Sequence, residues 1–157
     1  MRGKKAPKRE IVPDPKYKSV TIAKFINYLM RKGKKSVAQK IVYKAFDILA
    51  EKYKRDPLEI FDQAVRNVTP QVEVKSRRIG GANYQIPYQV RTDRGLILAL
   101  RWLIQAAKTR KGQPMKERLA LELMEAAQNQ GAAIKKKEDV FRMACANRAF
   151  AHFARWG

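Results

Sequence analysis

Lysine and arginine are the chemically distinctive residues of this sequence, and they gather in short runs. The 157 residues include 35 Lys and Arg against 14 Asp and Glu, which gives a formal net charge of +21. The runs fall in residues 2–9, 32–35, 75–78, 91–94 and 108–111. Guanidinium and ammonium groups bind phosphate through charge-assisted hydrogen bonds. The sequence therefore predicts a polyanionic partner, with nucleic acid as the first candidate.

Residues suited to catalysis are scarce. His152 is the only histidine, which excludes a two-histidine metal site. Glu122 and Glu125 stand three residues apart and could serve a metal-dependent nuclease, but we interpret them as solvated partners of Arg118 and Lys116. We therefore predict no enzymatic activity, no cofactor and no metal, and keep the nuclease as a rival interpretation.

The single cysteine, Cys145, excludes an intramolecular disulfide and a cysteine-based zinc site. We interpret it as a small buried hydrophobic residue in a protein of a reducing compartment. No apolar run approaches the roughly 18–20 residues that a membrane span needs. The basic first residues lack the apolar stretch of a secretory signal.

Apolar residues at helical spacing predict the elements that must position the charges. Helices are expected over residues 19–31 and 36–54, over a third segment with Asp56 as N-cap and Pro70 beyond its end, over a core segment at 96–107, around 119–131, and from 135 onward through Phe150. Residues 1–18 hold three prolines and little that could enter a core, which predicts a basic flexible arm.

Residues 72–90 change to a period of two on either side of Gly80 and Gly81, which predicts a β-hairpin. Pro87 lacks an N–H and disfavours a further strand beside it. The sequence thus predicts a mainly α fold of about six helices in a bundle, with one projecting two-stranded β-hairpin. The predicted domains are the arm, 1–18, and a single helical RNA-binding domain, 19–157. Tyr84 and Tyr88 suit base stacking or packing of the hairpin on the helices.

Several motifs, in order along the chain, resemble those of the bacterial-type small-subunit ribosomal protein seven family. They are Gly33-Lys34-Lys35, the hairpin run from Val74 to Pro87, Leu98 to Trp102, Lys135 to Val140 and Ala146 to Phe153. The resemblance covers nearly all of the chain after the arm. It implies a helical domain with a projecting hairpin in a cytoplasmic ribosome of bacterial type.

The resemblance also implies a role and partners. The protein would bind the 3′ major domain of small-subunit ribosomal RNA, organise the subunit head beside neighbouring head proteins, and lie near exit-site tRNA and mRNA. The implied contacts with ribosomal RNA are Arg2, Lys4, Lys5, Lys8, Arg9, Lys34, Lys35, Lys75, Arg91, Arg94, Arg101, Lys108, Arg110, Lys111 and Met115. The implied residues near tRNA and mRNA are Arg77, Arg78, Gly80, Gly81, Asn83 and Tyr84.

One departure from the family pattern concerns a phosphate contact. The family often has two consecutive arginines where this chain has Arg94 and Gly95. An alternative function is an architectural DNA-binding protein that uses the hairpin as a minor-groove arm. Such arms commonly insert an apolar wedge, whereas this hairpin's predicted tip is Gly80-Gly81-Ala82-Asn83.

Overall fold

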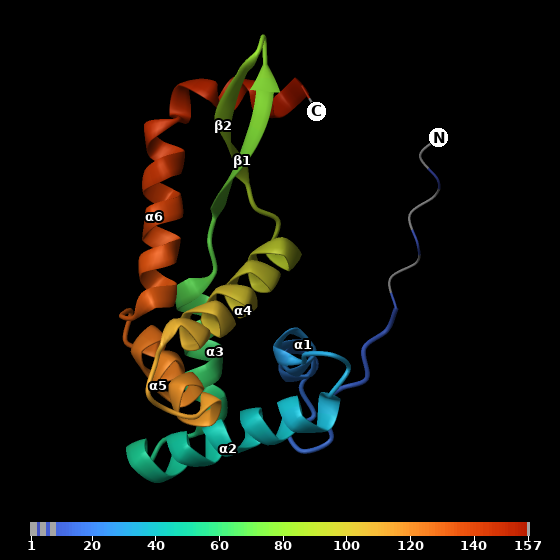
Figure 1. Ribbon diagram of the computed structural model, residues 1–157, viewed down its shortest axis with the longest axis vertical. Coiled ribbons are helices and arrows are strands. Elements are labelled where there is room, and N and C mark those ends of the chain that lie inside the picture. Colours follow the sequence, from blue (N-terminus) through green and yellow to red (C-terminus); the bar gives the residue numbers. More distant parts are fainter. Residues whose placement is uncertain (1–2, 4–5, 7–8, 157) are drawn as a thin grey trace. The chain divides into compact units, whose positions relative to one another are not determined.

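The computed structural model describes residues 3, 6 and 9–156 of the chain, and its elements are mainly helical (Figure 1). In chain order they are α1 (Val20–Leu29), α2 (Lys35–Tyr53), α3 (Pro57–Val68), β1 (Val72–Ile79), β2 (Ala82–Gln89), α4 (Thr92–Thr109), α5 (Met115–Ala127), α6 (Ala132–Ala146) and η1 (Arg148–Trp156). The predicted class, a mainly α fold with a β-hairpin, is confirmed. Among the described residues, the sixth predicted helix is two elements, because α6 ends at Ala146 and a 3₁₀ helix, η1, follows it.

The chain divides into two compact units, residues 1–40 and 41–157, so the division falls inside α2. In the first unit, Ser19 caps α1 by accepting a hydrogen bond from the amide of Ile22. Before it, the Asp14 carboxylate accepts hydrogen bonds from the amides of Lys16 and Tyr17, both at 3.1 Å. Asp14 is buried although it is charged. These bonds close a turn just ahead of α1.

The second unit has a core of aliphatic and aromatic side chains from helices α2 to α6 and from Ile86 of β2. Phe46 of α2 packs against Phe61 of α3, with ring centroids 5.7 Å apart. Helix α5 packs against α3 and α4. The central helix is α4, as expected, and Leu100 and Leu103 are fully buried in it. Burial of this apolar surface is the main force that holds the helices together.

Helix α3 begins and ends where its sequence predicts. Asp56 accepts a hydrogen bond from the amide of Leu58 at 2.9 Å, and Pro57 occupies the first helical position. The helix ends at Val68, and Thr69 has extended backbone angles, as expected for a residue before proline. At this end Asn67 donates hydrogen bonds from Nδ2 to the carbonyl oxygens of Ala126 and Ala127, at 3.0 and 2.9 Å.

The hairpin is an antiparallel pair whose register runs from Val72 opposite Gln89 to Ile79 opposite Ala82. Its loop is Gly80 and Gly81, with φ of +56° and +94°. Two positive φ values in a two-residue loop are the requirement that favours glycine there. In Figure 1 the hairpin runs beside α6 and η1 lies across it, and β1 contacts α6 while β2 contacts η1.

Two sequence-based interpretations of α6 are wrong. Cys145 is exposed, because the buried positions of α6 include Val140 and Ala144 and its neighbour Cys145 lies about 100° further around the helix. The run that begins at Lys135 lies inside the helix, because α6 begins at Ala132. No helix in the described part of the chain combines the length and apolarity of a membrane span.

Candidate nucleic-acid interface

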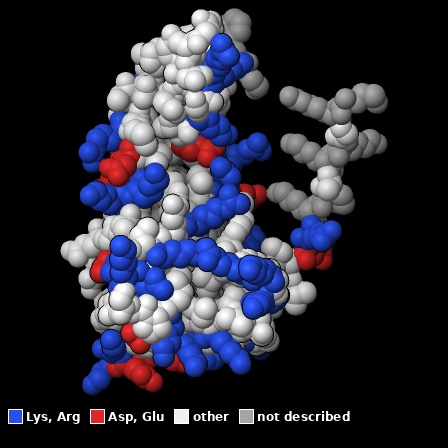
Figure 2. Space-filling model, viewed as in Figure 1, with Lys and Arg blue, Asp and Glu red and all other residues white. Residues whose placement is uncertain are grey.

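Basic side chains outnumber acidic ones on the face of the molecule drawn in Figure 2. Most of the residues predicted to contact ribosomal RNA are exposed, which leaves their charged groups accessible to phosphate. The exposed ones are Arg9, Lys34, Lys35, Lys75, Arg91, Arg94, Arg101, Lys108 and Lys111, whereas Arg110 and Met115 are partly buried. Arg2, Lys4, Lys5 and Lys8 lie outside the described residues.

Lys34 and Lys35 belong to the first unit, where α2 begins. Just before them, Lys32 and Gly33 have positive φ values of 50° and 72°. This turn separates α1 from α2 and leaves both lysines exposed at the start of the helix. The turn therefore presents a pair of cations that no element of the first unit covers.

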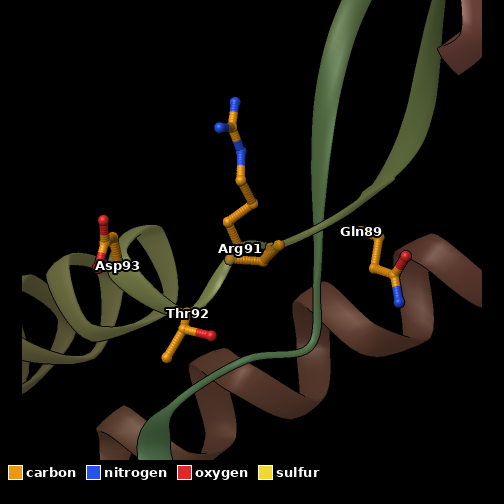
Figure 3. Close-up of a pocket in the computed structure, with 5 residues that line it drawn as sticks. Gln89, Arg91, Thr92 and Asp93 are labelled. Carbon is orange, nitrogen blue, oxygen red and sulfur yellow. The ribbon is translucent and has the colours of Figure 1, made fainter.

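The predicted contacts from Lys75 onward lie in the second unit, and two of them, Arg91 and Arg94, lie at the start of α4. A pocket of about 540 Å³ is lined there by residues 89–93, where β2 passes into α4 (Figure 3). Arg91 is the N-cap of α4 and makes no side-chain capping bond. Its side chain extends from the junction away from Thr92 (Figure 3). Since the N-terminus of a helix also attracts negative charge, this junction suits an anionic group.

Glu73, at the base of the hairpin, forms an ion pair with Arg94 of α4. Its carboxylate lies 2.9 Å from Nζ of Lys75 and accepts a hydrogen bond from Nε of Arg94 at 3.2 Å. Burial acts to raise the pKa of the Glu73 carboxyl, but the hydrogen bonds and charges of Lys75 and Arg94 outweigh it, so the pKa is lowered. Lys75 also lies over the ring of Tyr88, 5.0 Å from its centroid. These two cations are thus positioned by protein groups while remaining about half exposed.

The strand register divides the hairpin residues predicted to lie near tRNA and mRNA between two faces. Arg77 and Tyr84 are opposite each other on the η1-facing face, where Arg77 donates a hydrogen bond to the carbonyl oxygen of Phe153 at 3.3 Å. Arg78 and Asn83 form the next pair on the open face, and both are exposed. Gly80 and Gly81 are exposed at the tip.

The two tyrosines of β2 both lie on the η1-facing face. The Tyr84 ring packs against Phe150, with centroids 4.9 Å apart. Tyr88 pairs with Glu73 across the strands and is half-buried. Each ring therefore packs against protein groups, whereas the exposed Arg78 and Asn83 lie on the opposite face of the hairpin.

The loop between α4 and α5 holds a cluster that the sequence interpretation did not find. Glu122 is fully buried and pairs with Arg110, whose Nε and Nη2 lie 2.9 and 2.6 Å from Glu122 Oε2. Arg110 Nη2 also donates a hydrogen bond to Glu125. The interpretation of Glu122 as a solvated partner of Arg118 and Lys116 is therefore wrong. Its position three residues after the buried Leu119, on the buried stripe of α5, is the signal that could have revealed it.

The pKa of the Arg110 guanidinium is raised, first by its hydrogen bond to Glu125. Partial burial lowers this pKa, but the hydrogen bonds that Arg110 donates to Glu122 and the charges of both carboxylates outweigh that effect. Arg118 contributes through Nη1, which donates to the carbonyl oxygen of Arg110 at 2.6 Å. No sequence motif marks Arg118 or Glu73 as a residue that positions the basic side chains.

Close packing around residue 95 leaves little room for a side chain, which favours glycine there. Gly95 is buried in the first turn of α4, and a Cβ atom there would lie 3.0 Å from Cγ2 of Thr69. A long basic side chain at this position would meet the α3–β1 connection rather than solvent. The family often has arginine at both of the consecutive positions 94 and 95. In this chain only the first is arginine, the exposed Arg94, and the second is the buried Gly95.

Among the described residues, no three His, Cys, Asp or Glu side chains come together as a metal site would require. The exposed cations and the open hairpin face instead describe a basic binding protein of mainly helical fold. The chain belongs to the ribosomal protein S7p/S5e family, whose model matches residues 1–148. It is accordingly a structural protein of the small ribosomal subunit and not an enzyme.

Curated relatives are similar over nearly their full length. The small ribosomal subunit protein uS7 of Thermotoga neapolitana is 59% identical over 156 residues, which cover 99% of this chain and 100% of that protein. The protein of the same name from Dechloromonas aromatica is 56% identical over 152 residues, 97% of each chain. The family expected from the sequence motifs is therefore confirmed.

Proposed function

We propose that the protein binds small-subunit ribosomal RNA within its 3′ major domain and organises the head of the subunit beside neighbouring head proteins. It would act in the ribosomes of a bacterial cytoplasm. The observation that carries the proposal is the exposure of almost all the described cations predicted to contact RNA. Membership of the family supports the choice of RNA.

Binding would begin with electrostatic attraction between the +21 chain and the RNA backbone. Contacts with phosphate would come from separate regions of the chain. These regions are the arm (Arg2, Lys4, Lys5, Lys8, Arg9), the turn at Lys34 and Lys35, the base of the hairpin and the start of α4 (Lys75, Arg91, Arg94), Arg101, and the loop between α4 and α5 with its flank (Lys108, Lys111). Arg110 and Met115 of the same segment are partly buried. Such distributed contacts suit a folded RNA, which presents phosphates in several directions.

The hairpin would lie toward exit-site tRNA and upstream mRNA. Its open face offers Arg78 and Asn83, and its tip offers the exposed backbone of Gly80 and Gly81. Arg77 and Tyr84 would support this surface from the η1-facing side, since both contact η1.

Titration of the protein with an RNA fragment of the 3′ major domain, at several salt concentrations, tests RNA binding. Each neutralised phosphate releases counterions, so the logarithm of the association constant should fall steeply with the logarithm of salt concentration. Duplex DNA of equal charge serves as the competitor. An affinity for the RNA that stays flat between about 50 and 200 mM salt would refute the mechanism, and preference for duplex DNA would favour the architectural alternative.

A matched pair of hairpin variants tests the position near tRNA and mRNA. Small subunits reconstituted with Arg78→Ala should assemble a normal head but bind exit-site tRNA or upstream mRNA more weakly. Arg77→Ala should instead loosen the contact with η1 at Phe153. Failure of head assembly with normal exit-site tRNA occupancy in the Arg78→Ala subunits would contradict the proposed position of the hairpin.

A further inference from the structure

Arg110 differs from the other cations of the basic loop, which we define as residues 108–114. Its side chain is 27% exposed, and its guanidinium bridges Glu122 and Glu125 of α5. Lys108 and Lys111 are exposed on either side of it. The loop therefore contains one arginine that is already occupied by carboxylates and two lysines that are accessible to a ligand.

Glu122 connects the basic loop to two helices. Its side chain is fully buried in α5, and Oε1 accepts a hydrogen bond from the amide of Ala133 in the first turn of α6 at 2.9 Å. Oε2 accepts both bonds from Arg110. A buried carboxylate is costly unless it is paired and hydrogen-bonded. Glu122 therefore needs Arg110 as its partner, and the two hydrogen bonds between them fix the position of the Arg110 guanidinium.

Arg118 fixes the backbone of the same loop. Its Nη1 donates hydrogen bonds to the carbonyl oxygens of Arg110, at 2.6 Å, and Lys108, at 3.4 Å. These carbonyl groups thus face α5, and the basic loop is held through both a side chain and its main chain. Gly112 follows with φ of +82° and completes the turn toward α5.

We propose that Arg110 is a positioning residue, which holds the basic loop so that Lys108 and Lys111 face the RNA, and that it contacts no phosphate itself. This inference rests on the proposed function. A loop that is ordered before binding loses less conformational entropy when it meets its ligand, and affinity rises accordingly. Glu122 and Arg118 act with Arg110 in this role.

The main test uses the double variant Arg110→Met/Glu122→Gln, which removes the buried ion pair without leaving an unpaired buried charge. The slope of RNA affinity against salt should equal that of the wild type, because no phosphate contact is lost. The affinity itself should fall roughly three- to tenfold, because the loop must be ordered on binding. Trypsin should cut after Lys111 faster than in the wild type.

Lys111→Ala is the matched control, and it should lower the salt slope by about one unit. A loss of about one unit in the double variant as well would assign Arg110 to phosphate and overturn the proposal. Unchanged affinity and unchanged cleavage after Lys111 in the double variant would overturn it too.

Arg110→Lys provides the decisive comparison if the double variant fails to fold. Lysine keeps the positive charge beside Glu122 but cannot bridge two carboxylates with a planar fork. A positioning role predicts weaker RNA binding with an unchanged salt slope, whereas a phosphate contact would be preserved by lysine. Absence of any salt-dependent RNA binding by the wild type would refute the proposed function itself, which separates the two failures.

Discussion

The ring of Tyr84 on β2 packs against the ring of Phe150 on η1, with centroids 4.9 Å apart and planes inclined by 52°. A two-stranded hairpin alone is only marginally stable in water. Contacts with η1 therefore stabilise the hairpin, and Ile86 on the same face is fully buried. The C-terminal segment and the hairpin act as one structural element.

The Tyr84–Phe150 contact should give a measurable coupling energy. We expect the single variants Tyr84→Leu and Phe150→Leu each to lower the free energy of unfolding, and the double variant to lower it by less than their sum. The coupling should be about 0.5–1.5 kcal/mol. Urea unfolding of all four proteins measures it, and additivity within about 0.3 kcal/mol would show that the rings do not interact.

Gly95→Ala should destabilise the protein even though alanine favours helices. The new Cβ would lie 3.0 Å from Cγ2 of Thr69, and that side chain is held by a 2.6 Å hydrogen bond from Oγ1 to the carbonyl oxygen of Val65. We expect a loss of about 1 kcal/mol, typical of overpacking. In a Thr69→Ser background, which lacks Cγ2 but keeps the hydroxyl, Gly95→Ala should become stabilising by up to about 1 kcal/mol. Thermal unfolding of the wild type, the two single variants and the double variant measures these changes. If Gly95→Ala changed stability equally in the wild type and in the Thr69→Ser background, the proposed clash with Cγ2 would be contradicted.

The Glu73 bridge should make stability depend on acidic pH. The pKa of Glu73 is lower in the folded protein, so its contribution to stability is fully present above the unfolded value, about 4.3, and is lost as the pH falls through the folded value. The free energy of unfolding of the wild type should exceed that of Glu73→Gln by at most about 1 kcal/mol near pH 7, because Lys75 and Arg94 are about half exposed. The difference should vanish in strong acid. Arg94→Gln, which removes one partner, should show a smaller pH dependence.

Asn67→Ala should weaken the packing of α3 on α5. The Asn67 amide donates to the carbonyl oxygens of Ala126 and Ala127 in the last turn of α5, and the Ala126 oxygen also accepts a hydrogen bond from the amide of Asn129 at 3.1 Å. We expect a loss of about 1–3 kcal/mol in the free energy of unfolding. Asn67→Asp should lower the free energy of unfolding further, because a carboxylate would face two carbonyl oxygens at the negative end of a helix. If chemical denaturation showed that the Asn67→Asp variant is more stable than the Asn67→Ala variant, this arrangement would be contradicted.

Local chemistry was sufficient to predict the elements whose ends are set by short-range contacts. Asp56 and Pro70 predicted the limits of α3, and Gly80 with Gly81 predicted the hairpin loop. Each depends on bonds or steric effects within a few residues, which the sequence displays directly. The exposed cations were also predictable, since charged side chains are rarely buried without partners.

Long-range packing set the features that the sequence did not reveal. The burial of Glu122 depends on Arg110, twelve residues earlier, and on the amide of Ala133 in another helix. The break between α6 and η1 accompanies contacts of η1 with the hairpin, which is distant in sequence. Contacts between residues so far apart in the sequence leave no short motif from which they could be predicted.

The strand register has a consequence for how the hairpin can change over evolutionary time. Arg77 and Arg78 are neighbours in sequence, yet one faces η1 and the other the open side. Inserting or deleting one residue in β1 would exchange these two environments and turn every later side chain of the strand over. Lengthening by two residues would preserve both. We therefore expect hairpins of viable descendants to differ in length by even numbers of residues per strand, so that the face that carries Arg78 can grow or shrink without being inverted.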